Sequence, residues 1–137
     1  MKANLQRGAV MIEVMVAILI FSFAVLGLFG MQSVALKNTA QSNYRAAAVY
    51  LASQLVATAQ GDIKHLADYQ YTAGSTNTKV DPWLAEVRAV LPAAQATVSS
   101  TMETAPSTNG VLSVTVSWLA PGDTVRHQHT VSTYVSY

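Results

Sequence analysis

The sequence predicts an α+β protein in which one long N-terminal helix is followed by a small antiparallel β-sheet. Three observations lead to this fold class. An apolar run extends from Ala9 to Met31 and contains a single charged residue, Glu13. Segment 32–60 contains neither proline nor glycine and continues at helical spacing. From residue 93 onward, apolar and polar residues alternate with period two, and turn residues separate the runs.

The composition is that of a small chain with few charges and one strongly apolar block. The 137 residues allow one small domain in addition to the N-terminal segment. Charged residues make up 11% of the chain and the formal net charge is +1. Because no cluster of Lys and Arg is present, we expect no direct nucleic-acid binding. The chain has no cysteine, which excludes disulfides and thiolate metal sites.

Residues 1–8, MKANLQRG, form a short polar leader with two basic residues, Lys2 and Arg7. Lys and Arg beside a hydrophobic helix stay on the cytoplasmic side of a membrane. As a helix, segment 9–31 rises by about 35 Å, enough to cross a hydrocarbon core of about 30 Å. A carboxylate within such a span costs about 2.5–3.5 kcal/mol at its centre, so we expect Glu13 to have a specific role.

Three interpretations of this N-terminal segment compete. The first is a cleavable secretory signal peptide with Ser22-Phe23-Ala24 as its cleavage site. The second is an uncleaved signal anchor, and the third is a leader that is cut after Gly8. The third is favoured because the apolar run exceeds the roughly 7–15 residues of a signal-peptide core, inside which Glu13 would also lie.

A basic leader that ends in Gly8, followed by an apolar helix with a glutamate five residues after that glycine, resembles the type IV prepilins. The resemblance is specific over residues 1 to about 60 and weaker beyond. Within the family, the segment IEVMVAILIFSFAVLGLFGMQ is most similar to PilV-type minor pilins. The matching residues are Lys2, Arg7, Gly8, the segment Ala9-Val10-Met11-Ile12-Glu13 and the run from Val14 to Ile20.

The resemblance implies a set of processing and docking residues. Prepilin peptidase would cut between Gly8 and Ala9 and methylate the new amine of Ala9. Glu13 would then pair with such an amine during subunit docking. Many relatives have phenylalanine or methionine at the position of Ala9, and many close their C-terminal region with a disulfide that this chain lacks.

The resemblance also implies a location, a shape and partners. The chain would be a single-pass protein of the bacterial inner membrane, with its C-terminal domain in the periplasm, and later part of a pilus at the cell surface. The expected shape is the pilin lollipop. The expected partners are the major pilin, other minor pilins and a PilY-type tip protein, with roles in twitching motility, adhesion or DNA uptake. No cofactor and no enzymatic activity are implied.

Two other functions remain open from the sequence. A minor pseudopilin of a type II secretion system would share the leader, Glu13 and the domain plan. A membrane-anchored or secreted binding module or enzyme belongs to another class, and no site for one is evident.

The helix is expected to run from about residue 9 to residue 60 and to stop at Gly61-Asp62. Gly27 and Gly30 lie within it, either as small residues that allow close helix packing or as a flexible point. Its second half, 32–60, is predicted to be amphipathic, with a core-facing stripe formed by Ala47, Leu51, Leu55 and Ala59 beside Ala48 and Val56.

Segment 61–92 is expected to be a loop followed by a short helix. Residues 61–81 are predicted to form an irregular surface loop. The short helix would start with Asp81 as N-cap and Pro82 at its first position, and end before Pro92. Trp83 is expected to pack against the long helix.

Segment 93–137 is predicted to be a β-meander, so that 32–137 forms the domain outside the membrane. Its strands would cover 94–103, 111–119 and 125–137. Asn109-Gly110, within Ser107-Thr108-Asn109-Gly110, is typical of a hairpin turn, and Pro121-Gly122-Asp123 of a second turn. In the last strand, the core face is expected to begin only at Val131. In the middle strand, the core face is expected to contain Leu112, Val114, Val116 and Trp118.

The sequence offers little evidence for chemistry. His127 and His129 share one strand face near Asp123, but no third residue has the spacing of a metal ligand, so no metal site is predicted. His65 and Asp68 are expected at the surface. No nucleophile elbow, phosphate-binding loop or dinucleotide fingerprint is present.

Overall fold

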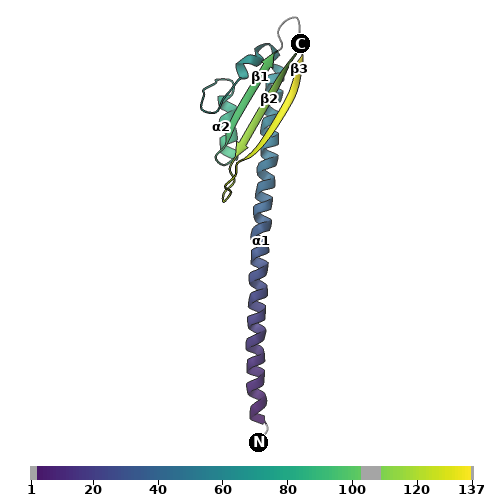
Figure 1. Cartoon of the computed structure of the whole chain (residues 1–137), viewed down its shortest axis with the longest axis vertical. Helices are drawn as coiled ribbons and strands as arrows, with labels where there is room; N and C mark the ends of the chain where they lie inside the picture. Colours follow the sequence, from purple (N-terminus) through teal and green to yellow (C-terminus); the bar gives the residue numbers. More distant parts are fainter. Residues whose placement is uncertain (1–2, 103–108, 137) are drawn as a thin grey trace. The chain divides into compact units, whose positions relative to one another are not determined.

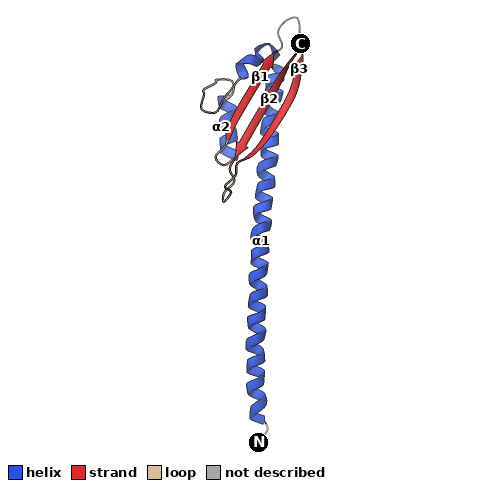
Figure 2. Ribbon diagram, viewed as in Figure 1, coloured by secondary structure: helices blue, strands red, loops and turns tan. Residues whose placement is uncertain are grey.

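The computed structural model describes residues 3–102 and 109–136, and only the backbone of residues 3–7 and 102. A long helix followed by an antiparallel sheet confirms the predicted α+β class (Figures 1 and 2). By its contacts, the chain divides into two compact units, Met1–Ala40 and Gln41–Tyr137. The elements are helix α1 (Ala3–Gly61), the 3₁₀ helix η1 (Ile63–Tyr69), helix α2 (Asp81–Val90) and strands β1 (Gln95–Met102), β2 (Asn109–Trp118) and β3 (His127–Ser136).

Helix α1 begins six residues before the predicted start and ends at the predicted glycine. The leader residues Ala, Leu, Gln and Arg all have high helix propensity, which accounts for the early start at Ala3. The helix continues through Gly27 and Gly30, where an added Cβ would meet no atom of the chain within 4 Å. After Gly61, a tight turn forms in which the Asp62 N–H donates to the Ala59 carbonyl oxygen at 3.1 Å.

Within the unit Gln41–Tyr137, residues 41–61 of α1 cover one face of the sheet. The predicted stripe is confirmed, since its apolar side chains lie in the core together with those of η1, α2 and the sheet. Ala52 joins the stripe, and Ala47 is only partly buried. The buried residues of α1 are Ala48, Leu51, Ala52, Leu55, Val56 and Ala59.

The sheet is antiparallel throughout, with strand order β1-β2-β3. The predicted core face of β2 is confirmed, because Leu112, Val114, Val116 and Trp118 are almost wholly buried. The opposite face of the sheet carries neutral hydroxyl and amide side chains in matched cross-strand rows. These rows include Thr97-Thr115-Thr130 and Ser99-Ser113-Ser132.

The core face of β3 begins earlier than predicted. His127 lies opposite Trp118 and stacks on it, with ring centroids 5.8 Å apart. The His127 side chain is therefore partly buried at the end of the core, whereas the sequence predicted a core face starting at Val131. An imidazole ring is flat and apolar enough on its face to close the core against an indole.

Part of segment 61–81 is regular, contrary to the prediction of an irregular loop. The 3₁₀ helix η1 places Ile63, Leu66 and Tyr69 at spacings of three residues, and the last two are buried. Tyr71 then forms an isolated antiparallel bridge with Val98 of β1. Packing against the core therefore orders a segment whose polar composition suggested a loop.

Helix α2 has the predicted extent, but Asp81 is not its N-cap. Val80 occupies that position, and the Asp81 carboxylate instead accepts the Asn77 N–H at 3.1 Å. The Asn77 carbonyl also accepts the Asp81 N–H at 2.7 Å, so a preceding turn leads directly into the helix. The predicted contact of Trp83 with α1 is confirmed, since its indole N–H donates to the Leu51 carbonyl oxygen at 2.8 Å.

One of the two predicted turns is confirmed. Gly122 has a φ of +81°, and the Asp123 N–H donates to the Ala120 carbonyl oxygen. The prediction of a turn at Asn109-Gly110 is wrong, because both residues belong to β2 and Gly110 pairs with Val135. Residues 107 and 108 of the same predicted turn lie outside the described residues.

The burial pattern predicts different costs for two valine truncations. Val114→Ala removes two methyl groups from a fully buried side chain, so the free energy of unfolding should fall by about 2 kcal/mol. Val125→Ala, at a valine that is 70% exposed, should change it by less than about 0.5 kcal/mol. Chemical denaturation of the detergent-solubilised chain measures both, and equal losses would contradict the assigned core.

Candidate functional site

The first candidate site is the apolar surface of α1 over residues 9–36. The large apolar side chains of this segment are between 50% and 73% exposed, except that of Val25, which is partly buried. This helix meets the length and composition needed to cross a membrane, and none of its most apolar window is buried. The exposed side chains are Val10, Met11, Ile12, Val14, Met15, Val16, Ile18, Leu19, Ile20, Phe21, Phe23, Leu26, Leu28, Phe29, Met31, Val34 and Leu36.

An apolar surface of this extent is unfavourable in water. Each Å² of apolar surface removed from water contributes about 25 cal/mol, and soluble monomers rarely expose apolar patches larger than a few hundred Å². The segment is therefore compatible with a single membrane span, and it is equally suited to burial against other apolar helices.

Glu13 lies within this apolar surface on the same helix as Ala9. The two residues are four positions apart, so they lie on one helix face, one turn from each other. No described side chain pairs with the Glu13 carboxylate. Of the predicted basic leader residues, Lys2 and the side chain of Arg7 lie outside the described part of the chain. The structure thus brings Gly8, Ala9 and Glu13 together within two turns of α1.

A second group of polar residues surrounds Asp62 at the end of α1. Its carboxylate oxygens lie 2.6 Å from Lys79 Nζ and 2.7 Å from His65 Nδ1. Lys79 Nζ also lies 3.5 Å from the Asp68 carboxylate and 5.0 Å from the centre of the Tyr69 ring. His65 and Asp68 lie at the surface, as predicted, whereas the central role of the Asp62 carboxylate was not predicted.

The charges of this cluster shift the acid–base equilibria of its members. The hydrogen bond from Lys79, and then that from His65, lowers the pKa of Asp62 from 3.8 to about 2. The same contact with Asp62 raises the pKa of Lys79. Asp62 thereby links η1 and the segment that contains Lys79 to the C-terminal end of α1. Its role is therefore structural.

A third group lies where the β2–β3 connection meets α1. His127 Nε2 is 2.9 Å from the Asp123 carboxylate and 3.2 Å from Gln41 Nε2. The sequence placed Asp123 near His127 but predicted no pair between them, and the contact with Gln41 was not foreseen. Within residues 3–102 and 109–136, no group of three or more His, Cys, Asp or Glu residues is arranged to hold a metal ion.

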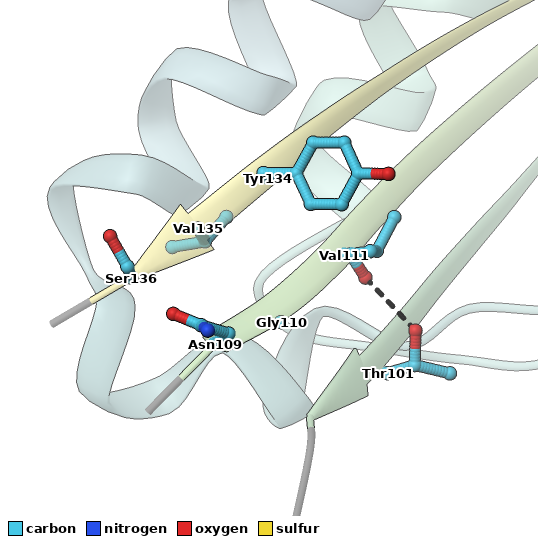
Figure 3. Close-up of a pocket in the computed structure, with 7 residues that line it drawn as sticks. All are labelled: Thr101, Asn109, Gly110, Val111, Tyr134, Val135 and Ser136. Carbon is cyan, nitrogen blue, oxygen red and sulfur yellow. Dashed lines mark hydrogen bonds between the residues drawn. The ribbon is translucent and has the colours of Figure 1, made fainter. Parts of the chain in front are cut away.

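A hollow lies between the ends of β1, β2 and β3 (Figure 3). It has a volume of about 460 Å³. Thr101 Oγ1 donates to the Val111 carbonyl oxygen at 3.4 Å along its wall. Its described lining contains no carboxylate, ammonium or imidazole group, so it offers neither a general base nor a charged anchor.

Comparisons with models of protein families, with curated proteins and with solved structures found no match for this chain.

The Asp62 cluster predicts a pH-dependent effect on stability. Because folding lowers the Asp62 pKa, its contribution is present above pH 3.8 and is lost as the pH falls through about 2. Asp62→Asn should therefore lower the Tm at pH 5, and the difference from the parent chain should shrink towards zero at pH 2. Asp68→Asn, at the longer 3.5 Å contact, is the control and should lower the Tm less. A Tm difference that stays constant from pH 5 to pH 2 would contradict this assignment.

Proposed function

We propose that this chain is a minor pilin of a type IV pilus, similar to the PilV-type proteins. The observation that carries the proposal is the combination of Arg7-Gly8, an exposed apolar helix and the single carboxylate Glu13 one turn after Ala9. A membrane anchor alone gains nothing from a carboxylate in its span, so the position of Glu13 points to a second environment.

In this proposal, the leader 1–8 is removed by prepilin peptidase. Cleavage after Gly8 creates a positively charged amine on Ala9, which the peptidase would then methylate. The new charge lies one helical turn from Glu13 within the chain, or close to Glu13 of a neighbouring subunit. Two opposite charges buried together cost much less free energy than either charge buried alone. The pair would therefore favour one register when a subunit docks.

The apolar surface of residues 9–36 would serve in two environments in turn. In the inner membrane it faces lipid, with the unit Gln41–Tyr137 in the periplasm. In the filament, the same side chains would be buried against the helices of other subunits. Lipid and protein interiors are similarly apolar, so the transfer need not expose this surface to water.

The proposed partners are prepilin peptidase, the major pilin, other minor pilins and a PilY-type tip protein. The roles would be to prime pilus assembly and to contribute to twitching motility, adhesion or DNA uptake. We propose no enzymatic activity for the chain. A minor pseudopilin of a type II secretion system is the alternative, since it would use the same leader and the same Glu13.

Replacement of Gly8 tests the cleavage site. A Cβ added at this position would meet no atom within 4 Å apart from neighbouring residues and the adjacent helix backbone, so Gly8→Ile should leave α1 intact. Immunoblots of membrane fractions should show the unprocessed precursor for Gly8→Ile and mostly the shorter form for the matched control Gly8→Ala. Normal processing of Gly8→Ile would rule out cleavage after Gly8.

Replacement of Glu13 tests docking separately from cleavage. Glu13→Ala should be processed normally, but its amine would lack a buried partner, so its level in sheared pilus fractions should fall by at least about tenfold. Glu86→Ala, at an exposed glutamate of α2, is the control and should be incorporated at the parent level. Normal incorporation of Glu13→Ala would contradict the proposed role of Glu13.

A further inference from the structure

Strand β3 forms one edge of the sheet, and no other described strand pairs with its outer side. It pairs with β2 through ten consecutive residue pairs, from Trp118–His127 to Asn109–Ser136. No backbone group in the described part of the chain hydrogen-bonds to its other side. Figures 1 and 3 show β3 as the outer strand. From this edge we propose that β3 binds an extended segment of a second, different polypeptide, which adds a strand to the sheet.

The opposite edge of the sheet, formed by β1, is partly covered. Tyr71 covers part of β1, since its N–H donates to the Val98 carbonyl oxygen at 2.9 Å and the Val98 N–H returns a bond at 2.8 Å. An edge strand presents N–H and C=O groups at a repeat of two residues, about 6.6–6.8 Å. This repeat matches the backbone of another extended polypeptide, which makes such a segment the occupant that fits the β3 edge.

Strand β3 also lacks the features that normally protect an open edge. Natural edges are blocked by lysine, by proline, by bulges or by inward-pointing charges. Segment 127–136 contains no Lys, Arg, Asp, Glu or Pro. Its register with β2 is unbroken, so no bulge interrupts it. An unprotected edge of this length is a liability unless a partner covers it.

The side chains of β3 indicate which pattern of apolar and polar residues an added strand would need. On the helix side, Val131 and Thr133 are only partly buried, whereas the facing residues of β2 are fully buried. An added strand with apolar residues at alternate positions would complete their burial. On the other side, Tyr134 is 87% exposed, lies opposite Val111 and is flanked along the strand by Ser132 and Ser136. The expected segment is therefore uncharged, with apolar and polar residues in alternation.

A different chain fits this edge better than a second copy paired in the antiparallel direction, and this choice of partner rests on the proposed membrane topology. Gln41 lies next to His127, and Gln60 bonds to Thr133, so residues 41–60 of α1 run parallel to β3. An antiparallel pair of two β3 strands would place the two Gln41 residues at opposite ends. Both copies enter the same membrane through the segment before Gln41, so they cannot pair in this way.

The test is hydrogen exchange on the full chain in detergent, with and without a peptide probe. The probe copies residues 111–118, VLSVTVSW, with flanking lysines for solubility, because this sequence already pairs with the other side of β3. The outward-facing amides of β3 should exchange at least about tenfold more slowly with the peptide bound, while β2 amides, already protected, change little.

Two lysine variants locate the binding. At Thr133→Lys, the charge points to the helix side and would be buried by an added strand, so the Kd of the peptide should rise at least about tenfold. Gln128→Lys places the same charge on the exposed face of the same strand and should leave the Kd within about twofold. Equal Tm values for the two variants exclude unfolding as the cause.

Three results would overturn the proposal. In the first, β3 amides exchange at the same rate with and without millimolar peptide. In the second, the peptide slows exchange only outside β3. In the third, β3 amides already exchange slowly without peptide, because copies of the chain pair with each other. All three are measured on the purified chain and do not depend on leader cleavage, so failure here is distinct from failure of the pilin proposal.

Discussion

The apolar surface of residues 9–36 is the constraint on which the rest of this protein depends. No described residue of its own compact unit buries this surface, and its large apolar side chains other than Val25 are at least half exposed. Such a surface is compatible with lipid or with burial against other apolar helices. Glu13 distinguishes between these two environments, because a carboxylate is costly in lipid but can be paired at a protein interface that supplies a positive amine.

The unit Gln41–Tyr137 is stabilised in a different way. Ala48, Leu51, Ala52 and Leu55 of α1 lie in one core with buried side chains of η1, α2 and the sheet. The chain has no cysteine, so this unit is held together by burial, hydrogen bonds and ion pairs such as Asp62–Lys79, without disulfides. The structure leaves two surfaces of the sheet available, an uncharged face and the open edge of β3. In the proposed filament, this unit would be the part that distinguishes this subunit from its neighbours.

Local periodicity was sufficient to predict the parts of the fold with a strong pattern. The core stripe of α1 and the buried face of β2 follow from spacings of 3.6 and 2 residues, and both are as predicted. The 3₁₀ helix at Leu66 and Tyr69 was missed because its order comes from packing against the core. Asn109-Gly110 was mistaken for a turn, although cross-strand pairing with Val135 extends β2 through Gly110.

For the candidate sites too, the sequence predicted only groups whose residues are close together in the chain. Gly8, Ala9 and Glu13 are close in sequence and lie on one helix, so their spacing could be read directly. The partners of His127 and Asp62 include Gln41 and Lys79, which are distant in sequence and meet only through the tertiary fold. The resemblance to the prepilins implies roles for the first group of residues. No local sequence pattern predicted the contacts of His127 and Asp62.

The central claim is that the mature chain begins at Ala9 with a modified amine and retains its apolar helix. The most direct test is mass spectrometry of the intact chain, and of its N-terminal peptide, purified from the membrane fraction of the native cell. The account predicts a mature N-terminus at N-methylated Ala9. A chain that still begins at Met1, or one that begins at Val25 after signal-peptide cleavage, would contradict it.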